Sequence, residues 1–255
     1  MQLKHILTAS SIAVMVAGPA LAENILRWTS QGDALTLDPH SQNESPTIAM
    51  NGQLYESLVT RDADLNLQPE LAESWSVNAD GWTFNLRKGV KFHDGADFTA
   101  EDVVFSFERA RHEASDYKEQ IKSITEVKVI DAHTVMLVTD GPNPILPNQL
   151  TSLYIMDKGW AETNNVVAPQ NFKAQEENFA VRNANGTGPF TLVSRAPDEK
   201  TIMVRNANWW GNGKFPGNVD RIEYRPITNA ATRVAALLSG EVDFVLDPPL
   251  QDLKR

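Results

Sequence analysis

Hydrophobic and polar residues alternate most clearly around residues 75–92. Trp82, Phe84 and Leu86 alternate with polar neighbours, which predicts a strand with one buried face. Four turn-forming residues come before this run, so residues 75–77 are predicted to be the partner strand of a hairpin. After a break at a glycine the alternation returns at residues 90–92, which predicts a short continuation of the strand.

A helix is predicted directly after this hairpin. Thr99 stands at the N-cap position, and Glu101 and Asp102 follow in the first turn, where negative charge suits the positive end of the helix dipole. Asp102 also stands where a capping box carries its acidic residue. Residues with helical spacing predict the buried side of this helix: Val103, Val104, Phe107 and Ala110.

The remaining pattern mixes helices with strands along the whole chain. Two further amphipathic helices are predicted over residues 47–59 and 230–238. Short apolar runs bounded by turns predict strands over residues 24–29, 121–129, 134–138, 191–193, 202–206, 221–224 and 242–246. Residues 161–180 are polar and poorly periodic, and residues 150–155 fit either a strand or a helix.

The first 22 residues have the three parts of a secretory signal peptide. A basic start at Lys4 leads into the apolar run 6–16, which is too short for a membrane span. Residues 20–22 form an Ala-Leu-Ala cleavage site, so we predict export and a mature chain that begins at Glu23. No later segment has the pattern of a membrane anchor, and a periplasmic location is predicted.

Composition narrows the chemistry that the chain can carry. The 255 residues contain no cysteine, which excludes disulfides, thiolate metal sites and a cysteine nucleophile. The net charge of −10 argues against nucleic acid and anionic membranes as partners. No cofactor is predicted.

Candidate catalytic motifs each have a simpler structural explanation. The glycine-rich residues 186–188 lead into a strand, without the lysine and helix that a phosphate loop needs, so a turn is favoured. His40, His93, His112 and His133 lack helical metal spacing and are interpreted as turn or surface residues. Acidic pairs such as residues 101–102 fit capping, and the tryptophans fit core packing. No nucleophile elbow, metal triad or buried carboxylate pair is visible, and the chain is predicted not to be an enzyme.

Several blocks of residues occur in an order typical of one family. The segment 71–110 resembles the signature region of the family 5 extracellular solute-binding proteins, the peptide-, dipeptide- and nickel-binding components of ABC importers. Residues 37–40 (LDPH) and 54–58 (LYESL) resemble motifs that precede it. Two later blocks, GTGPF with RN and WWG at residues 186–211 and R…LSGEVD at residues 233–243, continue the resemblance.

The resemblance implies a mixed α/β fold, the type II periplasmic binding protein fold, in which two lobes close over a solute. Residues 23–45 and 185–255 would form a discontinuous first domain, and residues 46–184 an inserted domain that contains the signature. Family members are about twice as long, so the second lobe is expected to be missing and the chain to be a truncated form. Closure over the solute would be a hinge motion without bond chemistry.

The resemblance also implies which residues and partners serve the function. The loop after the first strand would border the ligand, and Tyr117 is a second candidate; the loop consists of Ser30, Gln31, Gly32, Asp33 and Ala34. The expected partners are a small solute and the permease subunits of an ABC transporter, with the chain itself a monomer. An oligopeptide or dipeptide is the first solute, and nickel chelates, haem, opines and sugars are alternatives. A fragment without binding activity and an exported α/β hydrolase remain as other functions.

Overall fold

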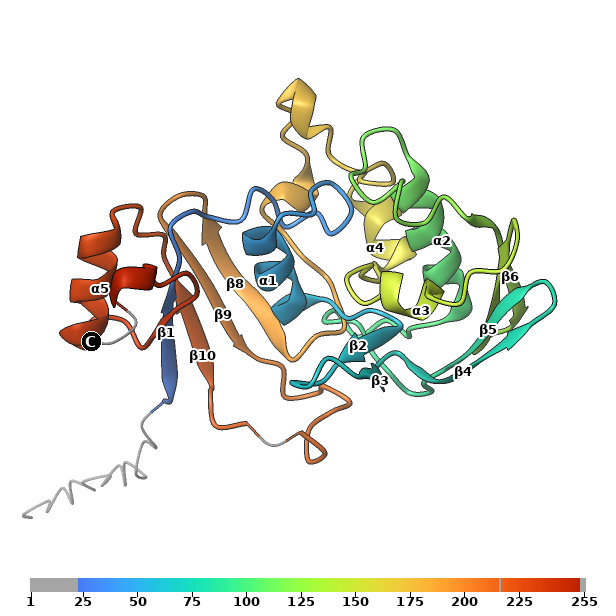
Figure 1. The fold of residues 1–255 in the computed structure, drawn as a ribbon, viewed down its shortest axis with the longest axis horizontal. Helices are drawn as coiled ribbons and strands as arrows, with labels where there is room; N and C mark the ends of the chain where they lie inside the picture. The colour runs from blue at the N-terminus through green and yellow to red at the C-terminus, as the bar shows by residue number, and fades with distance from the viewer. Residues whose placement is uncertain (1–22, 216, 253–255) are drawn as a thin grey trace, which may run out of the picture.

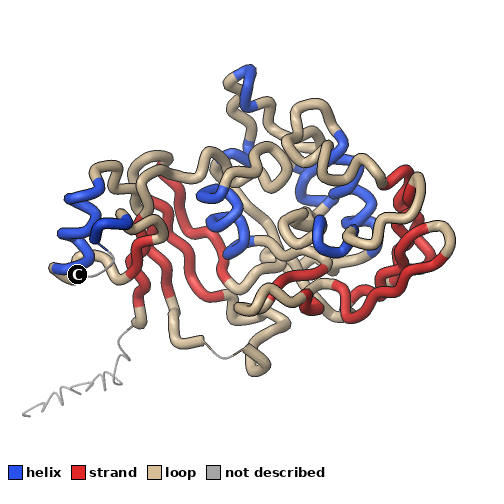
Figure 2. The backbone as a smooth tube through the Cα atoms, viewed as in Figure 1, coloured by secondary structure: helices blue, strands red, loops and turns tan. Residues whose placement is uncertain are grey.

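Two β-sheets with separate hydrophobic cores organise the chain. The computed structural model describes residues 23–215 and 217–252, so the predicted signal peptide lies outside the described residues. Figure 1 shows the two sheets side by side, with α1 (Ser45–Leu54) between them. Figure 2 shows that loops make up much of the rest. The mixture of helices and strands confirms the predicted α/β class.

The first sheet has five strands in the order β11-β1-β10-β9-β8. β8, β9 and β10 are antiparallel neighbours, whereas β1 runs parallel to both β10 and β11. α5 follows β10 and leads into β11. The bounds of these elements are β1 Ile25–Thr29, β8 Phe190–Ala196, β9 Lys200–Arg205, β10 Arg221–Tyr224, α5 Ala230–Leu238 and β11 Phe244–Val245.

The second sheet has four antiparallel strands in the order β4-β5-β7-β6. It contains the predicted hairpin, in which Trp75 pairs with Phe84 and Val77 with Trp82. The short strands β2 and β3 pair separately, and α2, α3 and α4 complete this half. The bounds are β2 Val59–Arg61, β3 Leu67–Pro69, β4 Ala72–Asn78, β5 Gly81–Leu86, α2 Ala100–Arg111, β6 Ile124–Asp131, β7 Thr134–Thr139, α3 Leu146–Gln149 and α4 Lys158–Thr163.

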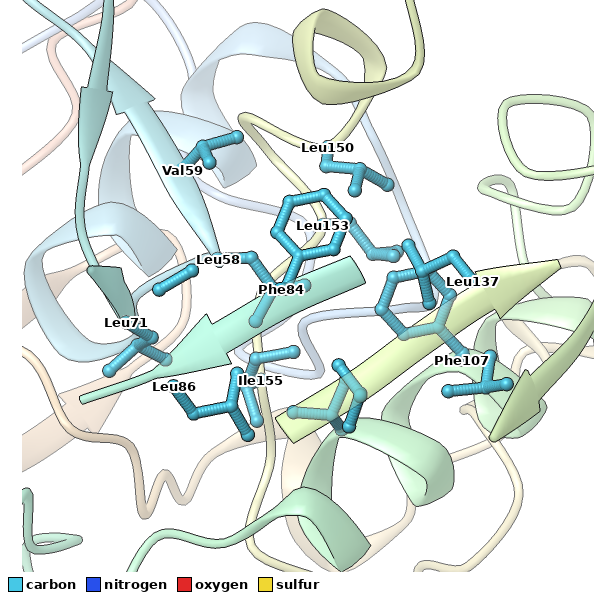
Figure 3. Packing of buried hydrophobic residues seen from close by; sticks show 14 of the residues in the cluster. Leu58, Val59, Leu71, Phe84, Leu86, Phe107, Leu137, Leu150, Leu153 and Ile155 are labelled. Carbon is cyan, nitrogen blue, oxygen red and sulfur yellow. The ribbon is translucent and has the colours of Figure 1, made fainter. Parts of the chain in front are cut away.

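Each sheet buries its own set of side chains. Phe84 on β5, Leu137 on β7 and Phe107 on α2 are fully buried and lie together in the core of the second sheet (Figure 3). Met50 and Leu54 of α1 pack in the other core with Trp28 and Tyr224. α1 therefore packs with the first sheet, although the predicted boundary at residue 46 assigns it to the inserted domain. The division into domains stays a prediction.

The local prediction for α2 is confirmed. The helix begins after Thr99, whose backbone N–H donates to Asp102 Oδ2 at 2.9 Å and whose hydroxyl donates to the same oxygen at 3.1 Å. This is the capping box with an aspartate in place of the usual glutamate. Val103, Phe107 and Ala110 are buried, as their spacing predicted.

Four local predictions differ from the structure. Residues 90–92 form no strand, and only a single bridge joins Lys91 to Asp97. α1 ends at Leu54, because the Gly188 N–H donates to the Leu54 carbonyl and Tyr55 is extended. Residues 150–155 form neither helix nor strand apart from a bridge at Tyr154. Residues 161–180 include the end of α4 and two 3-10 helices, Phe172–Ala174 and Phe179–Val181.

Candidate functional site

A hollow opens where parallel strands of the first sheet end. β1 and β11 run in the same direction, so their carboxyl ends lie at one edge, and the chain leaves them at Ser30 and Leu246. In open α/β sheets, ligands bind in the crevice outside the carboxyl ends of the strands. Three segments line the hollow: the loop after β1, the first turns of α1 and the chain after β11.

The volume of this hollow is about 590 Å³, which suits a small ligand. Its lining residues are Ser30, Gln31, Gly32, Ser45, Pro46, Ile48, Ala49, Leu246 and Asp247. The aliphatic members come from α1 and from the chain after β11, and the polar members come mainly from the loop after β1. The geometry therefore combines an apolar wall with a polar rim.

Hydrogen bonds to Tyr224 on β10 hold the first part of the loop. The Tyr224 hydroxyl lies 2.9 Å from Ser30 Oγ and also donates to the Gly32 carbonyl. Ser30 Oγ donates to the same carbonyl at 2.6 Å. Because burial raises the pKa of Tyr224 to about 12, the phenol keeps its proton and remains a donor. The loop is thus preorganised by the sheet beneath it.

A buried ion pair holds the second part of the loop. Arg195 Nη1 lies 3.2 Å from Asp33 Oδ1, and both side chains are almost completely buried. The other Asp33 oxygen accepts the N–H of Asp198 at 2.8 Å. Arg195 also donates to the Ala34 carbonyl, and Ala34 lies in the core. Asp33 and Ala34 therefore fix the loop and do not line the hollow.

Asp247 joins the chain after β11 to the loop after β1. Its two carboxylate oxygens accept the Gln31 N–H at 3.1 and 3.0 Å. Arg233 of α5 lies beside it, with Nε 3.3 Å from Asp247 Oδ1, and the Arg233 side chain is 3% exposed. A buried arginine thus neutralises the one charged side chain that lines the hollow.

The structure brings together part of the predicted ligand-binding set. Ser30, Gln31 and Gly32 line the hollow. Tyr117 lies elsewhere, 1% exposed, in the core of the second sheet, where its ring meets His40 edge-on. Sequence reasoning did not find the contribution of α1 or of residues 246–247. The sequence could have pointed to residues 246–247, because residues 242–246 are predicted as a strand. The carboxyl end of this strand, β11, lies beside that of β1.

The LDPH motif and the signature helix meet in a buried charged cluster. Arg109 of α2 binds both oxygens of Asp38, at 2.5 and 2.6 Å, and both side chains are fully buried. Burial alone would raise the pKa of Asp38, but Arg109 and the N–H of Gln170 outweigh it, so the pKa is lowered. His40 completes the cluster, 3.1 Å from Arg109 and 2.8 Å from the Tyr154 carbonyl.

A buried glutamate, Glu56, and a half-buried one, Glu70, lie between the sheets. The indole N–H groups of Trp209 and Trp210 donate to Glu56 Oε1 at 2.9 Å and Oε2 at 2.8 Å. Burial raises the pKa of Glu56 to about 7. Burial, and then the neighbouring Glu56 carboxyl, raises the pKa of Glu70 to about 8. Two carboxyls with raised pKa values, one buried and one half-buried, are therefore present, and the sequence did not reveal them.

This pair is a poor candidate for catalysis. Glu56 is 2% exposed, and both of its oxygens already accept hydrogen bonds from indoles. Glu70 Oε2 accepts the N–H and the hydroxyl of Ser57 at 2.8 and 2.7 Å. The Glu56 carboxyl holds the tryptophans of the loop after β9, and the Glu70 carboxyl holds Ser57. Both roles are structural.

The other candidate motifs have structural roles as well. Gly186 lies against α1, where an added Cβ would come within 2.1 Å of the Leu54 carbonyl oxygen, and its own carbonyl accepts the His93 N–H. The glycines therefore serve a close backbone approach that leads into β8. Among the described residues no group of His, Cys, Asp and Glu is arranged to hold a metal ion. No helix within residues 23–215 and 217–252 has the length and hydrophobicity of a membrane span.

Comparison with protein families gives one match that covers most of the chain. Residues 66–255 match the family described as "Bacterial extracellular solute-binding proteins, family 5 Middle". The glutathione-binding protein GsiB of Salmonella choleraesuis is 31% identical over 247 residues, which cover 95% of this chain and 45% of GsiB. The periplasmic oligopeptide-binding protein OppA of Escherichia coli is 28% identical and covers 89% of this chain and 44% of OppA.

Solved structures show the same fold. The periplasmic binding protein DppA of Helicobacter pylori, in complex with the peptide STSA, superposes with a TM-score of 0.79 at 28% identity. The match covers 91% of this chain and 48% of that protein. The chain thus spans about half the length of the relatives that it matches, both in sequence and in structure.

Proposed function

Because the chain belongs to the family 5 bacterial extracellular solute-binding proteins, we propose that it binds a small peptide-like solute for an ABC importer. The names of its relatives support this class of solute: GsiB binds glutathione, OppA binds oligopeptides, and DppA was solved with a peptide. The solute would pass from this chain to the permease subunits of the transporter. Export to the periplasm, where OppA acts by name, is part of the proposal.

The hollow at the ends of β1 and β11 carries the proposal. It lies at the carboxyl ends of parallel strands, and its loop is held in one conformation by Tyr224 and by the Asp33–Arg195 pair. A preorganised loop reduces the entropy lost when a ligand binds. Since the chain spans about half the length of its relatives, we propose that this hollow is one wall of their ligand site.

Binding without chemistry fits the lining of this hollow. Ser30 is the buried hydroxyl there, and its partners are a phenol and a carbonyl. Activation of a serine needs an adjacent general base, and the lining set contains no histidine or lysine. The proposal is therefore a binding protein and not a hydrolase.

Titration calorimetry of the full chain with the tetrapeptide STSA tests this proposal. We expect saturable binding in the millimolar to micromolar range, because one wall buries only part of a ligand. Ala49→Trp would fill the hollow and abolish the signal, whereas Ala79→Trp, in the exposed β4–β5 turn, would leave it unchanged. Absence of saturable binding, or equal binding by both variants, would contradict the proposal.

A further inference from the structure

Four of the residues that line the hollow are aliphatic. Pro46, Ile48 and Ala49 form one side from the first turns of α1, and Leu246 forms the other. Leu246 is 38% exposed, although it lies beside the buried end of β11. An exposed leucine facing a hollow lined by aliphatic groups offers apolar area that a ligand can cover.

Two polar groups at the rim, the Ser30 hydroxyl and the Asp247 carboxylate, already have partners within the chain. The Ser30 hydroxyl interacts with Tyr224 and Gly32. The Asp247 carboxylate receives the Gln31 N–H on both oxygens, and the buried Arg233 beside it cancels its charge. A ligand ammonium would have to compete with these contacts, and would gain less from Asp247 than from a free carboxylate.

A ligand anion has no partner of opposite charge in this wall. The lining residues include no lysine, arginine or histidine. Arg233 is 3% exposed, is paired with Asp247 and does not line the hollow, so it offers no direct contact to a ligand anion there. Moving an unpaired charge against an aliphatic wall costs free energy, whereas moving an aliphatic group there gains it.

From this geometry, and resting on the proposed function, we infer that this wall binds a neutral aliphatic side chain of a peptide and discriminates against charged side chains. The ligand group would lie between Ile48 and Leu246, with Ala49 and Pro46 beneath it. Charged ends of the peptide would then be held by groups outside this hollow. The inference names the class of side chain and not a particular solute.

Three tripeptides that differ at one position test the inference on the full chain. Ala-Leu-Ala, Ala-Lys-Ala and Ala-Glu-Ala share both termini, so differences in affinity report on the central side chain alone. We expect Ala-Leu-Ala to bind roughly tenfold or more tightly than either charged peptide, from the apolar area that leucine buries. Perturbation of the Ile48 methyl signals in NMR spectra would place the bound side chain in this hollow.

A charge-introducing pair of variants sharpens the test. Leu246→Lys places a cation in the wall and should reverse the preference toward Ala-Glu-Ala. Leu250→Lys is the matched control, because Leu250 is 83% exposed and does not line the hollow, and it should keep the original preference.

The possible outcomes separate the inference from the proposed function. Equal binding of the three tripeptides, or a preference for a charged one, would overturn the inference and leave the binding function standing. Saturable binding of none of them, and none of STSA, would overturn both. A leucine preference without any change at Ile48 would place the aliphatic site elsewhere and refute this assignment.

Discussion

Glu56, which is buried, and Glu70, which is half-buried, should make the stability of the protein fall as the pH rises. Burial raises the pKa of Glu56 from 4.5 to about 7 and, with the Glu56 charge added, that of Glu70 to about 8. Below pH 4.5 both folded and unfolded chains hold these protons, so the stabilising contribution is complete. As the pH rises the unfolded chain releases them first, and stability is lost until the folded carboxyls also ionise.

The size of the effect follows from the shift of Glu56. At ~1.4 kcal/mol per pKa unit, a rise from 4.5 to about 7 corresponds to about 3 kcal/mol of unfolding free energy. His40 acts in the opposite direction, because burial and then Arg109 lower its pKa to about 4, so its contribution is lost as the pH falls below 6.5. The two effects overlap, and a variant is needed to separate them.

Glu56→Gln removes the titrating group and keeps the shape of the side chain. Urea unfolding followed by tryptophan fluorescence, from about pH 5 to about pH 8, gives the unfolding free energy at each pH. The variant should lose the Glu56 part of the decline, so that the difference between its curve and that of the wild type changes by about 2.5 kcal/mol across this range, while the Glu70 part remains. Glu119→Gln, an exposed residue paired with Lys122, is the control and should follow the wild type.

The result would also show where the proton resides. Indole N–H groups donate to Glu56, which favours its anion, so Glu70 is the carboxyl that keeps its proton to the higher pH. Glu70→Gln should then flatten the curve as strongly as Glu56→Gln. Parallel curves for the wild type and both variants would refute the reasoning, because no titrating carboxyl would then be buried here.

Three further variants test the buried contacts. Asp38→Asn leaves the charge of Arg109 buried without a counterion, and should lower the unfolding free energy by about 3–5 kcal/mol in urea; no loss would mean that the pair is solvated. Gly186→Ala should cost about 1–3 kcal/mol because of the 2.1 Å approach to a carbonyl, whereas Gly32→Ala, with open space around it, should cost under ~1 kcal/mol; equal costs would count against the packing argument. Tyr224→Phe should cost about 1 kcal/mol in thermal unfolding and weaken binding of STSA, while unchanged affinity would show that the loop needs no support from β10.

Local features of the fold were predictable because their causes lie within a few residues. The β4–β5 hairpin follows from alternation and a turn, and the cap of α2 follows from Thr99 and Asp102, three residues apart. The failure at residues 90–92 has a physical cause. Val90 and Phe92 are buried, so they keep the alternation of a strand, but no neighbouring strand pairs with them beyond one bridge.

Distant contacts were not predictable in the same way. Asp38 and Arg109 are 71 residues apart, and Glu56 and Trp209 are 153 apart, so no local pattern links them. The loop from Ser30 to Gly32 was found only through resemblance to a family. No local pattern marks Asp247 either, because its partner Arg233 lies on another element.

The positions of the family motifs explain how they can serve binding without touching the hollow. Asp38 lies between the loop after β1 and the start of α1, which are two of the three segments that line the hollow. Arg109 fixes Asp38 from the second sheet, and the Thr47 hydroxyl, on α1, accepts the Leu35 N–H at 2.8 Å. Since a buried bidentate ion pair tolerates little displacement, Arg109 holds Asp38 in place between these two segments. The signature helix is therefore linked to the hollow through the LDPH segment, which leads from the loop after β1 to α1.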